Sequence, residues 1–147
     1  MNYHYTECGL SYIYLEDGYE VENIDGDTYV GIEDVDGLHR VIAKNVTEKK
    51  STLEGQEIRF LRVEMGMSQK HLAEILGVDT QTVARWEKDQ TVIPRTSDAV
   101  LRTLYLESVD TSSNVSFFLR LLAENEETAA IEQLILKAEN HHWSVAI

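Results

Sequence analysis

Two short apolar runs on either side of a glycine constrain this chain more than any other feature of its sequence. The stretch MSQKHLAEILGVDTQTVARWEKDQ, residues 67–90, repeats apolar side chains at helical spacing before and after Gly77. Ser68 and Asp79 are residue types that cap helix N-termini, and Gly77 can adopt a positive φ without strain. The sequence therefore predicts two short helices joined by a tight turn.

The two faces of these predicted helices differ in chemistry. Ala73 is small enough to let the helices cross closely, while Val83 and Trp86, three positions apart, both face the core. The side chains that are left to point outward from the second helix are Thr80, Gln81, Ala84, Arg85 and Lys88. This is the layout of a helix-turn-helix, whose second helix enters the DNA major groove by its N-terminal end.

The outward side chains suit contact with double-stranded DNA. Glutamine pairs with adenine and arginine with guanine through two hydrogen bonds each, and a threonine or alanine methyl group contacts thymine. Gln69 stands at the start of the first helix, where a helix N-terminus can meet a phosphate, and Lys70 follows it. The expected DNA contacts are Gln69, Lys70, Thr80, Gln81, Thr82, Arg85 and Lys88.

A wider set of residues at matching spacing resembles the Cro/CI type of helix-turn-helix, also called the XRE family. The set comprises Arg62, Met67, Ser68, Gln69, Leu72, Ala73, Leu76, Gly77, Val78, Val83, Trp86 and Glu87. The resemblance implies a structural ion pair between Arg62 and Glu87 behind the recognition helix. It also implies DNA contacts by Gln69, Thr80, Gln81 and Arg85. One departure is the loop KDQTVIP, residues 88–94, which lacks the glycine often found after the glutamate and leaves the entry to the next helix open.

The residues before this segment are predicted to form strands and then a helix. The runs LSYIYL and YEVENI, residues 10–15 and 19–24, flank an Asp-Gly pair that predicts a hairpin, and TYVGI at 28–32 predicts a third strand. A helical stripe follows, made of Leu38, Val41, Ile42 and Val46. The polar stretch KKSTLE at 49–54 predicts a domain boundary.

The residues after the boundary are predicted to be mostly helical. A helix near 55–65 aligns Ile58, Leu61 and Met65, and Pro94 suits the first turn of another helix that ends near Glu107. Two further helices are predicted at 115–124 and 128–140, and WSVAI at the C-terminus has the alternation of a strand.

These segments together predict an α+β fold with three parts. A small β-meander plus helix covers residues 1–50, and it would bind a partner or sense a ligand. An all-α, Cro/CI-like helix-turn-helix domain covers 51–107. A helical C-terminal extension covers 108–147, and its apolar residues offer a dimer interface or extra packing on the same subunit. They are Phe118, Leu119, Leu122, Ile131, Leu134, Ile135 and Ala138.

Charge is distributed unevenly over a chain whose net charge is −13. Residues 1–50 carry 11 acidic and 4 basic side chains, residues 51–107 carry 9 and 7, and residues 108–147 carry 6 and 2. An acidic body discourages loose binding to phosphate, so DNA contact would be confined to one face of the middle segment. A single cysteine, Cys8, and the lack of a signal-peptide or membrane-helix pattern predict a cytoplasmic protein without membrane contact.

A second resemblance concerns the order of the parts. A small β-rich N-terminal domain followed by a Cro/CI-type domain is similar to MqsA-type antitoxins, whose N-terminal domain is built on a four-cysteine zinc site and engages a toxin. This chain has one cysteine, so that zinc site cannot form in the same way. A site drawn from His4, Cys8, His141 and His142 would need ligands from distant segments, and we expect neither a metal nor a cofactor.

The residues favour a regulator over an enzyme. No glycine-rich phosphate loop, nucleophile elbow or zinc-protease motif is present in the sequence, and no catalytic residue is expected. The principal expectation is a homodimeric transcriptional regulator, in particular an autoregulatory repressor on a palindromic operator. Two alternatives stay open: an antitoxin whose acidic N-terminal domain neutralises a toxin, and a repressor whose N-terminal domain senses a small molecule.

Overall fold

The computed structural model describes residues 2–109 and 133–146, which divide into two compact units. The first unit comprises the chain up to Ile42 together with the C-terminal strands, and the second begins at Ala43. The strands are β1 (Tyr3–His4), β2 (Ile13–Leu15), β3 (Tyr19–Ile24), β4 (Asp27–Ile32), β5 (Leu134–Glu139) and β6 (His142–Val145). The helices are α1 (Val35–Glu48), α2 (Gly55–Glu64), α3 (Gln69–Leu76), α4 (Thr80–Glu87) and α5 (Arg95–Val109).

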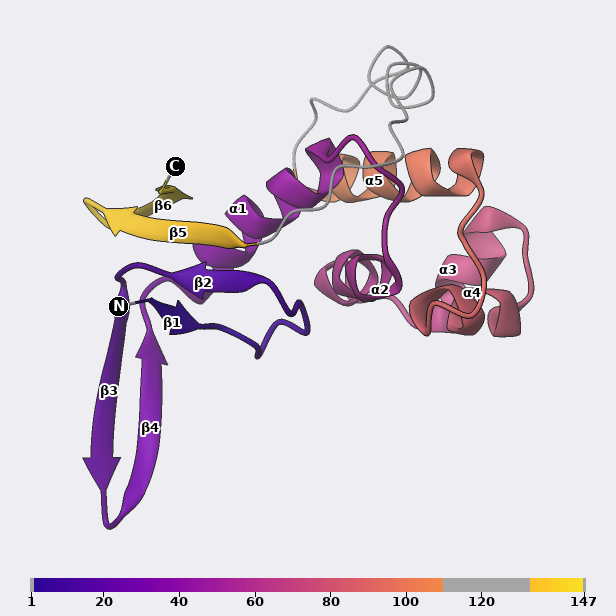
Figure 1. The fold of residues 1–147 in the computed structure, drawn as a ribbon. Coiled ribbons are helices and arrows are strands. Elements are labelled where there is room, and N and C mark those ends of the chain that lie inside the picture. The colour runs from indigo at the N-terminus through magenta and orange to yellow at the C-terminus, as the bar shows by residue number, and fades with distance from the viewer. Residues whose placement is uncertain (1, 110–132, 147) are drawn as a thin grey trace. The chain divides into compact units, whose positions relative to one another are not determined.

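The first unit contains a four-stranded sheet in the order β1-β2-β5-β6 (Figure 1). Strands β2 and β5 are parallel, with Ile13 opposite Leu134, and the two outer pairs are antiparallel. The buried side chains of β2 and β5 alternate along each strand, as in a sheet with one face on a core. On α1, Leu38, Ile42 and Val46 are buried and Val41 is half-buried, which confirms the predicted helix and three of the four buried positions.

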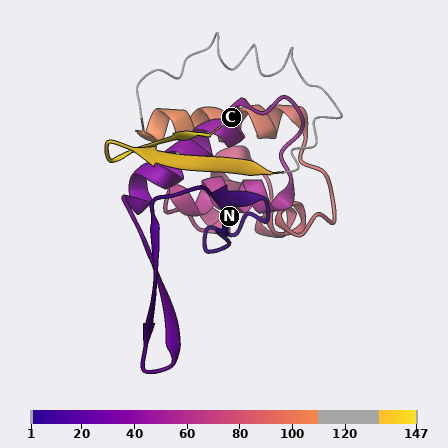
Figure 2. The same ribbon diagram turned by 60° about the vertical axis from the view of Figure 1, so that its left-hand side comes forward.

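Strands β3 and β4 form a separate two-stranded ribbon (Figures 1 and 2). Its loop is the pair Asp25 and Gly26, both with positive φ, as a type I′ hairpin turn requires. Except at its base, most of its side chains are exposed. Strands were therefore correctly predicted in both YEVENI and TYVGI.

Two predictions about the strands and helices were wrong. The hairpin across Asp17 and Gly18 does not form, because β2 pairs with β1 and β5 while β3 pairs with β4. The helix predicted at 128–140 is replaced over Leu134–Glu139 by β5, whose short apolar run fits a buried strand as well as it fits a helix. The helix predicted at 115–124 lies outside the described residues, as do Phe118, Leu119, Leu122 and Ile131.

The second unit is built on four helices after the end of α1. Helix α2 packs against α4 and α5, and α3 packs against α4. Ile58, Leu61, Leu72, Val83 and Leu101 are its most deeply buried aliphatic side chains. Among the described helices, none combines the length and the apolar character that crossing a bilayer demands.

Candidate nucleic-acid interface

The turn between α3 and α4 follows from three local features of the sequence. The Ser68 hydroxyl accepts a hydrogen bond from the His71 backbone N–H at 3.0 Å, which caps α3. Gly77 ends α3 with φ 71°, and the Val78 N–H then donates to the Ala73 carbonyl at 3.0 Å. Ala73 is only 1% exposed. The chain is thereby turned sharply into α4.

Helix α4 separates an apolar face from a polar one. Val83 and Trp86 are buried at 0% and 3% exposure, whereas Thr80, Gln81, Arg85 and Lys88 are exposed and Thr82 is half-buried. Asp79 occupies the N-cap position without a side-chain capping bond. Arg85 Nη2 donates to Gln81 Oε1 at 3.3 Å, so these two polar side chains lie together.

The N-terminus of α3 carries the other expected DNA contacts. Lys70 is exposed, and Gln69 is half-buried. The Gln69 side-chain amide donates to Glu87 Oε1 at 3.1 Å, which connects the start of α3 to the end of α4. The side-chain amide of Gln69 is therefore already bound within the protein, and only the exposed part of this residue is available to contact a DNA phosphate.

An ion pair lies behind these two helices. Arg62 Nε is 2.6 Å from Glu87 Oε2, and Arg62 Nη2 is 3.0 Å from Glu87 Oε1. Arg62 Nη1 also donates to the Met67 carbonyl at 2.9 Å. The side chains of Arg62 and Glu87 are only 12% and 5% exposed. Through its two hydrogen bonds to Glu87 and its bond to the Met67 carbonyl, Arg62 links α2 to α4 and to the residues just before α3. The structure thus brings together the two residues that the family resemblance pairs.

Asp89 resolves the question left open by the missing glycine in the loop after α4. It adopts φ 58°, the left-handed conformation that aspartate tolerates better than most residues. Its Oδ1 accepts a hydrogen bond from the Gly55 N–H at 2.8 Å and so satisfies a free amide at the start of α2. A Cβ at Gly55 would lie 2.5 Å from the carbonyl oxygens of Trp86 and Glu87, so α2 approaches this loop closely. Sequence analysis missed both roles, although an Asp at the expected glycine position was a usable signal.

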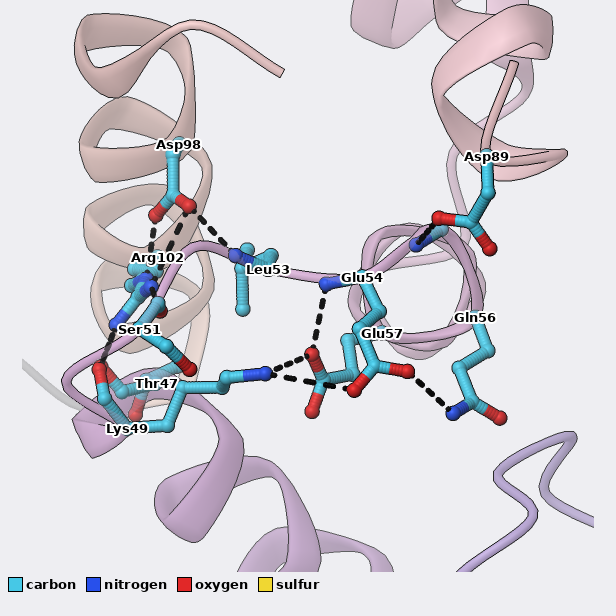
Figure 3. A network of polar contacts seen from close by, with 11 residues as sticks. Thr47, Lys49, Ser51, Leu53, Glu54, Gln56, Glu57, Asp89, Asp98 and Arg102 are labelled. Atoms are coloured by element: carbon cyan, nitrogen blue, oxygen red, sulfur yellow. Dashed lines mark hydrogen bonds and ion pairs between the residues drawn. The ribbon is translucent and has the colours of Figure 1, made fainter. Parts of the chain in front are cut away.

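A second buried arginine fixes the segment that leads into α2 (Figure 3). Arg102 Nε is 2.5 Å from Asp98 Oδ1. The Arg102 guanidinium also donates to the carbonyls of Thr47, Lys49 and Ser51. Sequence analysis missed this cluster, because carbonyl acceptors leave no trace in residue identity.

Asp98 and Lys49 extend this cluster to the start of α2. The other oxygen of Asp98 accepts from the Leu53 N–H at 2.8 Å. Lys49 Nζ lies 2.7 Å from Glu57 Oε1, which also accepts from the Glu54 N–H. The polar stretch 49–54, which predicted a domain boundary, is thus held by hydrogen bonds and ion pairs along most of its length.

The comparison with protein families agrees with this geometry. Residues 58–101 match the helix-turn-helix family model. This segment is a Cro/XRE-type helix-turn-helix. The match covers α3, α4, most of α2 and the start of α5, so the DNA-binding class is shown for 44 of the 147 residues. The searches of curated proteins and of solved structures return no significant match.

Two of the residues considered for a zinc site, His4 and His141, make other contacts. The ring of His4 stacks on Tyr14 and hydrogen-bonds to the Ser11 carbonyl at 2.8 Å, and His141 Nδ1 lies 2.7 Å from Glu33 Oε1. Within residues 2–109 and 133–146, no group of three or more His, Cys, Asp or Glu side chains is arranged to hold a metal ion.

Proposed function

We propose that this helix-turn-helix protein is a transcriptional repressor that binds a palindromic operator as a homodimer. The chain's DNA-binding class comes from the family match, and the specific contacts are our inference from the polar face of α4. The observation that carries the proposal is the exposure of Thr80, Gln81 and Arg85 on a helix whose opposite face is locked into the core. A recognition helix needs this combination of free polar side chains and a fixed axis.

The contacts divide into two groups by their chemistry. Gln81 and Arg85 carry the two-pronged hydrogen-bonding groups that read base edges, and the methyl group of Thr80 suits thymine. Gln69, Lys70, Thr82 and Lys88 surround these positions and supply phosphate contacts, which hold the helix in register without reading sequence. Repression would follow when the bound dimer blocks access of polymerase to the promoter.

Selection of bound duplexes from a random DNA pool tests this proposal directly. We expect an enriched site with twofold symmetry and half-sites about one helical turn apart, because a dimer presents two copies of α4 on one face of the duplex. Enrichment of a single asymmetric site by a monomer in sedimentation would contradict the dimer. No enrichment of any sequence would contradict specific binding.

Substitutions then separate the two groups of contacts. Arg85→Ala is expected to weaken binding to the selected site by about 1–3 kcal/mol and to relax its sequence preference. Lys70→Ala should weaken binding to all duplexes alike and make the dependence on salt shallower. Arg40→Ala, which removes an exposed arginine from α1 outside the helix-turn-helix, is the matched control and should change neither. Equal losses for Arg40→Ala and Arg85→Ala would show that only net charge matters.

The remaining expectations stay predictions. They are autoregulation, a cytoplasmic location, toxin neutralisation and the sensing of a small molecule. The dimerising segment is also left open, although Leu134 is unsuited to an interface because it is buried in the sheet of the first unit.

A further inference from the structure

The β3–β4 ribbon is firmly attached at its base. Trp143 of β6 donates from Nε1 to the Glu33 carbonyl at 2.8 Å, and its ring occupies the space that a Cβ at Gly18 would need. The Glu33 N–H in turn donates to the Gly18 carbonyl at 2.9 Å, and His141 contacts the Glu33 carboxylate. The ribbon is therefore fixed at the sheet, while its strands extend beyond these contacts.

One face of the ribbon combines carboxylates with exposed apolar groups. The register sets Glu22 opposite Tyr29, Glu20 opposite Gly31 and Ile24 opposite Asp27. Because side chains alternate along a strand, these residues share one face. We call Glu20, Glu22, Ile24, Asp27 and Tyr29 the acidic face.

The acidic face has exposed side chains and open space, which suit the binding of a cationic side chain. Tyr29 and Ile24 are each 52% exposed, and nothing lies within 4 Å of a Cβ built at Gly31, next to Tyr29 on the same face. The space beside Tyr29 at the position of Gly31 is thus open, and Glu22 is the residue opposite Tyr29 on the neighbouring strand. A lysine or arginine placed there would meet both an aromatic ring and carboxylates, which reinforce one another.

No described basic side chain forms an ion pair with Glu20, Glu22 or Asp27. Residues 16–36 contain nine acidic side chains and no lysine or arginine. Such a surface repels nucleic acid, and it equally repels a second copy of itself. Residues 110–132 of the same chain carry five acidic side chains and one arginine, so they too have the wrong charge to cover it.

We propose that the acidic face of the β3–β4 ribbon is a docking surface for an arginine- or lysine-rich segment of another protein. The segment lies extended along the ribbon, with one cationic side chain over Tyr29 beside Glu22 and others at Glu20 and Asp27. Its apolar side chains cover Ile24. This surface belongs to the first unit, whereas the side chains of α4 that we propose as DNA contacts belong to the second.

Titration of the full-length protein with a short peptide that alternates arginine and valine tests the proposal. Binding is expected, and the triple variant Glu20→Gln, Glu22→Gln, Asp27→Asn should weaken it about ten-fold, the summed effect of three exposed ion pairs. Tyr29→Leu keeps an apolar side chain but removes the aromatic ring, and a smaller loss of about three-fold is expected from it. Circular dichroism shows whether each variant keeps its fold.

The control for net charge is a second triple variant, Glu48→Gln, Glu74→Gln, Glu107→Gln, which removes three exposed carboxylates outside the ribbon. It should change the affinity for the peptide by less than about two-fold, because it removes the same number of charges and none of them belongs to the acidic face. Equal losses for the two triple variants would overturn the proposal, since the peptide would then respond only to the charge of the whole chain. Failure of the wild-type protein to bind the peptide would overturn it as well.

Hydrogen exchange of the protein alone distinguishes the other occupants. The outward amides of β3 and β4, which do not pair within the ribbon, are expected to exchange rapidly at all protein concentrations. Protection that grows with concentration would assign the face to a second copy. Protection at every concentration, lost on deletion of residues 110–132, would assign it to that segment. Either result would overturn the proposed basic partner.

Discussion

Two arginines of the second unit, the half-buried Arg62 and the buried Arg102, both connect separate segments of the chain, but they bind different kinds of partner. Arg62 links two elements of the helix-turn-helix through a carboxylate, Glu87, on another helix. Arg102 pairs with Asp98 on its own helix, and its other donors hold three backbone carbonyls of the segment before α2. One arginine therefore orients helices of the recognition motif, and the other fixes the approach to it.

The two arginines differ in how many other contacts hold together the segments that they connect. Around Arg62, the Gly55–Asp89 hydrogen bond also joins α2 to the loop after α4, Gln69 joins α3 to Glu87, and α2 packs against α4. In the segment at 47–53, by contrast, the carbonyls of Thr47, Lys49 and Ser51 all accept hydrogen bonds from the single guanidinium of Arg102. We therefore expect the loss of Arg102 to be the more damaging, and the following changes test that ranking.

Replacing Arg102 with methionine is expected to have the largest effect. The change leaves Asp98 without its cationic partner and leaves buried carbonyls without a hydrogen-bond donor. We therefore expect a loss of about 3–5 kcal/mol in the free energy of unfolding. Urea denaturation measures it. The double variant Arg102→Met with Asp98→Leu should recover little, because the carbonyls and the Leu53 N–H stay unsatisfied. A loss below about 1 kcal/mol in the free energy of unfolding would show that other contacts are enough to keep the segment at 47–53 in place.

Replacing Arg62 with methionine should cost less, about 2–3 kcal/mol, because its partners are fewer and its side chain is nearer to solvent. Here the double variant Arg62→Met with Glu87→Met should recover most of the loss, since both members of the pair are then removed. A double-mutant cycle gives the coupling energy. If this double variant recovered no more of the lost stability than the double variant at Arg102 and Asp98, the proposed difference between the two sites would be wrong.

Gly55→Ala tests the close approach of α2 to the loop after α4. The added Cβ would force apart two stretches of backbone, and we expect a loss of about 1–2 kcal/mol in the free energy of unfolding. Gly31→Ala is the matched control, because nothing lies within 4 Å of its Cβ position, and it should be neutral or slightly stabilising. Thermal unfolding followed by circular dichroism compares the two, and equal stability would mean that α2 can shift freely.

Substitutions at Asp89 are expected to have the smallest effects on the free energy of unfolding. Asp89→Gly keeps the left-handed conformation but loses the cap on Gly55, whereas Asp89→Ala loses both. We expect about 0.5 kcal/mol for glycine and about 1 kcal/mol for alanine, with Asp89→Asn close to wild type. The chemical midpoint of unfolding resolves this order. A glycine variant more stable than wild type would mean that the backbone conformation, and not the cap, is what this position requires.

Much of the helix-turn-helix could be predicted because its determinants are local. The Ser68 cap, the Gly77 turn and the burial of Val83 and Trp86 each depend on a few neighbouring residues, and all are found as expected. The boundaries of α3 and α4 follow from the same signals. The DNA contacts themselves stay predictions, because exposure is necessary for them but does not demonstrate them.

The pairing of the strands, and the strand at β5, escaped prediction for the opposite reason. Strand β5 pairs with β2, and the Ala138 N–H donates to Asp17 across 121 positions of the chain. A short apolar run such as LILKA fits a helix or a strand equally well until its neighbour is known. The Asp-Gly pair at 17–18 likewise resembles a hairpin turn, yet it marks the point where the chain leaves one sheet for the ribbon.

The sequence by itself determined the recognition motif, since spacing, capping and turn chemistry within residues 58–101 leave one arrangement of α2, α3 and α4. It also determined which side of α4 is polar. Only the tertiary structure decided that the C-terminal strands complete the N-terminal sheet and that Arg102 holds the segment before α2. Both depend on backbone hydrogen bonds between distant residues, and a backbone amide or carbonyl is the same in nearly every residue type.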